Sequence, residues 1–295
     1  MLRPDFETTI LNSTAPWKDE LKDELVKLTR LAIRAQPCKK SENAPIGTSR
    51  LGGNPDLPPS LDWPVWQGVS LPFIGQINLI ELPNITGREL LPEQGMLYFF
   101  YAIDTVDGHE LPTGLSPTER GAFPVVFSDA RYSPAPRDFP VDLVQKNAES
   151  IHPVIFEPLP LKYAPFNTFP DLEHPLLEEL GFVIGETPTW ELYEVLKDCW
   201  GWKTTEGQPD NRILGYPCPI QTSVCADIEK GYSGYWDSAK DGKGLPIVSE
   251  EKRRILFERS KTWELLLQVD TQDELNDMIW GDCGKIYYMI RVCFI

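Results

Sequence analysis

The chain has 295 residues, of which 41% are hydrophobic and 11% aromatic, enough for one large domain or two modest ones with a real core. Its net charge of −16 is uneven, because residues 61–295 hold nineteen basic and thirty-six acidic groups, and this surface disfavours binding to DNA or RNA. The sequence has no run of 18 apolar residues and no apolar signal-peptide core, which predicts a cytoplasmic protein without a membrane span.

The six cysteines are widely spread and include no C-x-x-C pair. This pattern is that of neither a disulfide framework nor a zinc site, so we expect free and mostly buried thiols. No cofactor and no metal site is expected from the sequence.

The N-terminal region is expected to contain an amphipathic helix. Between Asp19 and Gln36, apolar residues recur at helical spacing, and Pro37 would end the helix. Residues 37–60 are rich in Pro, Gly, Ser and Asn, which predicts a long irregular connection. Within it, Gly52-Gly53 indicates a backbone position that a Cβ would block. We therefore expect residues 1–50 to form a helix and connecting loop, followed by a single domain over 51–295.

A pair of similar segments, at about 71–101 and 265–290, suggests an internal repeat. FIGQIN at 73–78 corresponds to LLLQVD at 265–270, and GMLYF at 95–99 corresponds to GKIYY at 284–288. Each copy reads as a strand, an Asx-initiated turn or short helix, a glycine and a second strand.

Strands are predicted at 71–76, 96–103 and 123–128, where β-branched and aromatic residues cluster between turn signals. Residues 104–120 and 129–150 are expected to be exposed loops. A further strand is predicted over 152–158, and Pro153 and Pro158 would confine it to a sheet edge.

The stretch from Asp171 to Asp198 is strongly acidic, with a net charge of −7. It predicts two helices, at roughly 174–180 and 189–199, that pack through aromatic residues and are acidic outside. The acidic face is either a solvated surface or a docking surface for a basic protein, formed by Glu178, Glu179, Glu186, Glu191 and Glu194.

Beyond this stretch, helices are predicted near 221–228 and over 249–260, and a final strand over roughly 284–294. The elements show no regular βαβ rhythm. The predicted fold class is therefore α+β, with a mostly antiparallel sheet, short helices, the N-terminal amphipathic helix and two related strand-turn-strand halves.

Catalytic signatures are absent: the sequence contains no G-x-G-x-x-G, Walker loop, H-E-x-x-H or G-x-S-x-G. His109, His152 and His174 are isolated from one another, which favours surface or structural roles. Asp237 and Asp241 match part of a calcium loop, but Ala239 occupies a ligand position, which argues against calcium.

The glutamines of the repeat, Gln76 and Gln268, are the other candidates for a site. A buried amide needs partners, so each glutamine either ties its strand to a neighbouring loop or points into a polar cleft shared by the two halves. Asp270, Trp280 and Asp282 would belong to that cleft. Asp270 and Asp282 could equally cap turns.

Several motifs in order along residues 50–290 resemble the YwqG-like family, a bacterial family of uncharacterised function. They are Gly52-Gly53-x-Pro55-x-x-Pro58, Trp63-Pro64, Pro72-Phe73-x-x-Gln76-Ile77-Asn78-Leu79, Pro92-x-x-Gly95-x-Leu97-x-Phe99-Phe100, Leu214-Gly215-Tyr216-Pro217-x-x-x-Gln221, Leu267-Gln268-x-Asp270 and Trp280-Gly281-Asp282-x-Gly284. The resemblance implies a soluble bacterial α+β protein and no accepted activity. Members of such families sometimes sit beside toxin genes, which suggests a neutralising role by association.

Two functional hypotheses follow. The first is a non-catalytic protein whose acidic surface binds a basic protein, such as a toxin. The second is an enzyme or small-ligand-binding protein with a polar cleft between the two halves. The uneven charge and the missing catalytic motifs favour the first.

Overall fold

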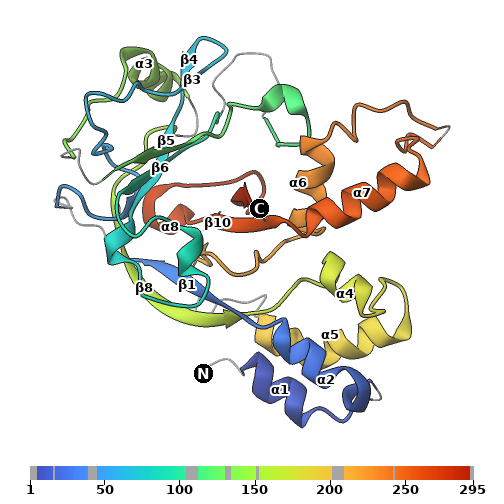
Figure 1. The fold of residues 1–295 in the computed structure, drawn as a ribbon. Coiled ribbons are helices and arrows are strands. Elements are labelled where there is room, and N and C mark those ends of the chain that lie inside the picture. The colour runs from blue at the N-terminus through green and yellow to red at the C-terminus, as the bar shows by residue number, and fades with distance from the viewer. Residues whose placement is uncertain are drawn as a thin grey trace.

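The computed structural model describes residues 5–15, 17–38, 45–103, 112–129, 134–150, 153–200, 209–241 and 243–292. It is a mixture of helices and antiparallel sheet, which confirms the α+β class (Figure 1). The helices are α1 Phe6–Asn12, α2 Lys18–Lys27, α3 Val141–Glu149, α4 Pro175–Glu179, α5 Thr187–Trp200, α6 Val224–Tyr232, α7 Glu250–Ser260 and α8 Asp273–Asn276.

The main sheet of the described residues has nine strands in the order β11-β10-β9-β1-β8-β2-β5-β6-β7, and every neighbouring pair is antiparallel. A separate hairpin pairs β3 with β4. The strands are β1 Arg30–Pro37, β2 Arg50–Leu51, β3 Val65–Trp66, β4 Val69–Ser70, β5 Phe73–Asn78, β6 Met96–Phe100, β7 Val125–Ser128, β8 Leu159–Thr168, β9 Arg212–Ile213, β10 Trp263–Asp270 and β11 Lys285–Arg291.

Both faces of the sheet are covered. Along β6, Met96, Tyr98 and Phe100 pack in one apolar cluster, whereas Leu97 and Phe99 pack in another, as the alternation of a strand requires. Helix α3 contributes Leu143 to the first cluster. A third cluster joins α1, α2, α4 and α5 beside one end of β1 and β8 (Figure 1). A cavity lies between this helical unit, formed by α1, α2, α4 and α5, and the sheet.

The predicted helix over 19–36 is wrong in its second half. Helix α2 ends at Lys27, and residues 30–37 form β1, in the middle of the sheet between β8 and β9. Leu31, Ile33 and Ala35 alternate with Arg30, Arg34 and Gln36, as the period of two of a strand requires, and the small apolar Ala32 is the exception to this alternation. The helical spacing of the apolar residues in α2 continues into β1 by coincidence, through Ala32 and Ala35. Strand β1, which precedes residue 50, thus belongs to the same sheet as the later strands.

Two further predictions need correction. The strand expected over 152–158 lies later, at 159–168, and it is a central strand rather than an edge, because β8 pairs with both β1 and β2. The stretch 129–150 is not only a loop, because α3 begins directly after Pro140. Proline at the start of a helix gives up no intrahelical hydrogen bond, so the proline marks a helix start here.

Other predicted elements are confirmed. Strands β5, β6 and β7 occupy the positions expected from 71–76, 96–103 and 123–128, and α4, α5, α6, α7 and β11 lie close to their expected ranges. Gly52 has φ +65°, and a Cβ there would lie 2.4 Å from the carbonyl oxygen of Glu157. His109 and His152 lie outside the described residues. Among the described residues, no helix has the length and apolar character needed to cross a membrane.

Candidate functional site

Gln76 is completely buried on β5, and its amide is bonded to residues on both sides of β2 in the sequence. Its Nε2 donates to the carbonyl of Thr48 at 2.8 Å and to Oδ2 of Asp56 at 2.7 Å, and its Oε1 accepts from the backbone N–H of Asp56 at 2.8 Å. Asp56 is also paired with Arg50, at 2.8 Å between Nη2 and Oδ1. Burial opposes the charge on Asp56, but the hydrogen bonds from Arg50 and Gly47 hold its pKa below the ordinary value.

Gln268 on β10 is equally buried and makes a comparable set of bonds. Its Nε2 donates to the carbonyl of Asp210 at 2.6 Å, and its Oε1 accepts from the N–H of Cys218 at 2.8 Å. Arg212 lies opposite Gln268 in the sheet, and its Nε donates to Oδ1 of Asp210 at 3.2 Å. Both glutamine amides are therefore engaged by their own loops, and neither residue lines the two cavities described below. Each glutamine therefore connects its strand to a neighbouring loop, which is the first of the two alternatives expected from the sequence.

The other residues expected in that cleft lie around the end of β10. Asp270 accepts from the N–H of Asp210 at 2.8 Å, and Trp280 donates from Nε1 to the carbonyl of Asp270 at 3.1 Å. Trp280 is buried and packs edge-on against Phe156. Asp282 is exposed in the turn before β11. The structure thus brings Asp270 and Trp280 together, next to Asp210 just before β9.

The acidic residues of the expected docking surface lie on or beside α4 and α5. Glu179 forms an ion pair with Lys261 at 2.5 Å, and Glu194 forms one with Lys197 at 2.5 Å. Glu178 and Glu186 are exposed. Glu191 and Glu194 line an open groove between α1 and α5, in which Trp190 is 56% exposed.

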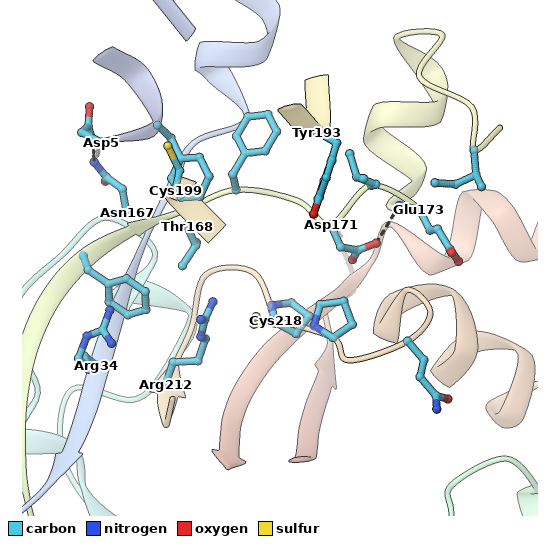
Figure 2. Close-up of a pocket in the computed structure, with 18 residues that line it drawn as sticks. Asp5, Arg34, Asn167, Thr168, Asp171, Glu173, Tyr193, Cys199, Arg212 and Cys218 are labelled. Atoms are coloured by element: carbon cyan, nitrogen blue, oxygen red, sulfur yellow. Dashed lines mark hydrogen bonds between the residues drawn. The ribbon is translucent and has the colours of Figure 1, made fainter. Parts of the chain in front are cut away.

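A cavity of about 300 Å³ lies between the sheet and the helical unit, and it is the best-formed candidate site in the described part of the chain (Figure 2). Its floor is formed by side chains on one face of three adjacent strands, namely Arg34 on β1, Phe166 and Thr168 on β8, and Arg212 on β9. Its apolar walls include Phe6, Phe169, Leu172 and Ile184. Such a mixture of apolar walls and a few polar groups is typical of small-molecule sites.

Two guanidinium groups meet at the floor of this cavity. Arg34 and Arg212 are direct partners in the antiparallel register. The Cζ atoms of Arg34 and Arg212 lie 4.3 Å and 5.2 Å from the centroid of the Phe166 ring. The charge of Asp210 is favourable to both arginines: although Asp210 is buried, its pKa is lowered by the nearby charges of Arg212, Lys285 and Arg34. The floor therefore carries two guanidinium groups, of which that of Arg212 is paired with Asp210.

A carboxyl group with a shifted pKa lies on another side of the cavity. Asp171 follows β8, and its oxygens accept from the hydroxyl of Ser223 at 3.1 Å and from the N–H of Glu173 at 3.0 Å. Burial raises the pKa of Asp171 to about 7 despite these bonds. At neutral pH this carboxyl group is therefore present in both its protonated and its ionised form.

The remaining reactive side chains do not form a catalytic set. Cys199 and Cys218 line the cavity, and burial raises the pKa of the Cys199 thiol, which lies 3.3 Å from the Thr9 hydroxyl. His174 is buried, its pKa is lowered to about 3 by burial, and its Nδ1 accepts from the N–H of Leu176 at the start of α4. Within the described ranges, no group of three His, Cys, Asp or Glu side chains is placed to hold a metal ion. Asp241 accepts from two N–H groups of its own loop.

Comparison with known proteins gives a family and no activity. A family model described as Domain of unknown function (DUF1963) matches residues 49–292. A search of curated proteins found no match. The matched range contains most of the cavity lining, including Phe166, Asp171 and Arg212, whereas Arg34 and the α1 residues precede it.

Proposed function

The chain belongs to the family described as Domain of unknown function (DUF1963), and we propose that it binds a small molecule whose anionic group lies against Arg34 and Arg212 in the cavity. The observation that carries this proposal is the pair of guanidinium groups that share one aromatic ring at the cavity floor. Arginine is well suited to carboxylate and phosphate groups because its planar fork can donate two parallel hydrogen bonds.

The bonding of Arg212 leaves donors for a ligand. Arg212 uses Nε and Nη2 for Asp210, and Nη1 donates to the carbonyl of Tyr216 at 3.0 Å. A guanidinium carries five N–H groups, so these three bonds do not use all of them. In a site with apolar walls, a charge-assisted bond to such a donor is stronger than in water.

We further infer that the two strand-turn-strand segments are related halves of one fold. Arg50 lies opposite Gln76 as Arg212 lies opposite Gln268. Tyr98 donates its hydroxyl to the carbonyl of Asp56 at 2.6 Å, and Tyr287 donates to the carbonyl of Cys218 at 3.1 Å, so the tyrosine bonds correspond as well.

One difference between these halves supports the cavity as the site. In the first half, the carboxylate of Asp56 accepts hydrogen bonds from both terminal nitrogens of Arg50, at 2.9 Å from Nη1 and 2.8 Å from Nη2. In the second half, Cys218 stands at the position that corresponds to Asp56, and Asp210 binds Arg212 from its Nε side. The Nη1 group of Arg212 therefore donates to a backbone carbonyl, that of Tyr216, whereas the Nη1 group of Arg50 donates to a carboxylate.

The test uses a variant that removes one of the two cations and keeps both members of the Asp210–Arg212 ion pair. We expect Arg34→Gln to weaken the binding of monocarboxylates from propanoate to octanoate by about 10- to 100-fold, the range for loss of a charge-assisted hydrogen bond. Binding is measured by thermal shift and calorimetry. Arg253→Gln, an exposed arginine on α7, is the matched control and should bind as the unchanged protein does. Equal binding by the Arg34→Gln protein, or no binding of any carboxylate by the unchanged protein, would overturn the proposal.

A second candidate function is the docking of a basic protein segment in the groove between α1 and α5. The observation that favours it is Trp190, which is exposed beside Glu191 and Glu194 in that groove. An aromatic face flanked by carboxylates is suited to Lys or Arg side chains. The test is affinity capture from lysate at low and moderate salt with the Glu191→Lys, Glu194→Lys double variant. A basic partner that binds only the unchanged protein, and less at higher salt, is expected; a partner retained by the variant would contradict this function.

A further inference from the structure

The cavity has opposite charges on its two sides. In Figure 2, Arg34 and Arg212 lie toward one side, whereas Asp171 and Glu173 lie on the other, beyond the Cys218 loop. Asp171 is mostly buried, and Glu173 is exposed at the mouth of the cavity. Apolar side chains, among them Phe169 and Leu172, line the space between. This arrangement of charge is complementary to a molecule with two unlike ends.

We propose that the ligand carries an ammonium group as well as an anionic group, and that Asp171 and Glu173 receive the ammonium while Arg34 and Arg212 receive the anion. This inference rests on the proposed function and specifies its ligand class: a zwitterion with an apolar middle. A purely anionic ligand would place its apolar end against two carboxyl groups, which would lose hydration without gaining a partner. An ammonium there replaces that hydration with charge-assisted hydrogen bonds.

The surroundings of Asp171 agree with a role toward a cation. The titratable groups that lie near it are Glu173, Tyr193 on α5, His174 at the start of α4 and Cys225 on α6. None of these four groups supplies a positive charge at neutral pH, because His174 is held neutral by burial, and the cation near His174 and Cys225, Arg30 on β1, is paired with Glu264 at 2.9 Å. Ser223 and the N–H of Glu173 orient the carboxyl, and neither of them neutralises it. The cavity therefore provides an oriented acid without a cationic partner among these groups.

Binding of an ammonium should depend on pH in a defined way. An ammonium favours the ionised form of Asp171, whose pKa in the empty protein is about 7. Below that pH, part of the binding free energy is spent on removing the proton. By linkage, the affinity for the zwitterion should fall by about tenfold from pH 8 to pH 6, whereas the affinity for a monocarboxylate should show no such fall from this group.

The experiment compares ω-amino acids, from 3-aminopropanoate to 8-aminooctanoate, with the monocarboxylates of equal chain length. The series covers a range of separations between the two charges. We expect at least one ω-amino acid to bind tenfold or more tightly than its matched monocarboxylate at pH 8. Asp171→Asn, which has the same shape and no charge, should abolish that difference and its pH dependence, while the monocarboxylates bind at least as tightly as they do to the unchanged protein.

The outcomes separate the two proposals. If monocarboxylates bind through Arg34 but no ω-amino acid binds more tightly, the ammonium site is wrong and the anion site stands. If Asp171→Asn leaves the preference for the ω-amino acid unchanged, Asp171 does not receive the ammonium. If neither series binds, the proposed function is wrong and the zwitterion inference fails with it. Circular dichroism of Asp171→Asn confirms that the comparison is made on a folded protein.

Discussion

Arg34 on β1 lies directly opposite Arg212 on β9, and both guanidinium groups lie over the ring of Phe166. Like charges at directly opposite positions of an antiparallel pair destabilise a sheet. Here the cost is offset by Asp210 and by cation–π contact with Phe166. The sheet thus holds two cations side by side at the floor of a cavity, and this pairing is the basis of the binding site that we propose.

Loss of either buried glutamine should destabilise the protein. Gln76→Leu leaves the N–H of Asp56 and the carbonyl of Thr48 buried without their present partner, and Gln268→Leu does the same to Cys218 and Asp210. At about 1–3 kcal/mol for each unsatisfied group, each variant should lose about 2–6 kcal/mol of unfolding free energy. Urea denaturation measures this loss.

The control for the glutamine variants is Gln145→Leu, an exposed position on α3. It should change the unfolding free energy by less than about 0.5 kcal/mol. An equally small change for Gln76→Leu would show that the tie between β5 and its loop is not important for stability.

Gly52→Ala should be far more damaging than Gly68→Ala. Both glycines have positive φ, at +65° and +85°, so both substitutions carry the backbone penalty of about 1 kcal/mol. At Gly52 the new Cβ would also meet the Glu157 carbonyl oxygen at 2.4 Å, whereas nothing lies within 4 Å at Gly68. Thermal denaturation of the two variants separates the two effects. Equal melting temperatures would contradict the close approach at Gly52.

Breaking the buried ion pair between Asp210 and Arg212 should be costly. Asp210→Asn leaves Arg212 buried without its counter-charge, which typically costs about 3–5 kcal/mol. Glu194→Gln, which breaks an exposed pair with Lys197, should cost less than about 0.5 kcal/mol. Chemical denaturation compares the two. A small effect at Asp210 would mean that the buried charges are neutralised in another way.

Asp171 should make stability depend on pH. Because burial raises its pKa to about 7 in the folded protein, the folded state holds a proton that the unfolded chain releases at lower pH. The stability that comes from this protonated form is complete below the unfolded pKa of 3.8 and is lost as pH rises through about 7. Asp171→Asn should therefore be more stable than the unchanged protein at pH 8, by on the order of 2–4 kcal/mol.

The same comparison at pH 5 should show a much smaller difference, since Asp171 is then protonated in the folded state. His174→Gln is a useful second variant because the pH dependence of stability that His174 causes has the opposite direction. Its pKa is lowered to about 3, so its neutral burial destabilises the protein as pH falls below about 6.5. A gain in Asp171→Asn that is independent of pH would contradict the pKa of Asp171.

Local patterns in the sequence were sufficient to predict the strands around Gln76 and Gln268, because each is bounded by a glycine or an Asx residue. They were misleading for β1, where Ala32 and Ala35 continue the helical spacing of α2 although Leu31 and Ile33 alternate as in a strand. Pro160 and Pro165 obscured β8 for a similar reason, since proline is uncommon inside a central strand.

The cavity was not predicted at all. Its residues come from α1, β1, β8, α5 and the loop after β9, and they meet only because β1 pairs with β8 and β9. No short motif records such long-range pairing. One signal was present: Arg50-Leu51-Gly52-Gly53 resembles Arg212-Ile213-Leu214-Gly215, and that similarity could have drawn attention to Arg212.

A crystal structure of the protein with 4-bromobenzoate tests the central claim most directly, since the anomalous signal of bromine fixes the orientation of the bound molecule. We expect the carboxylate to lie within hydrogen-bonding distance of Arg34 and Arg212, with the ring in the space lined by Phe166 and Phe169. Density for the carboxylate elsewhere in the cavity, or for the ligand only outside it, would contradict the assignment of the two arginines as the anion site.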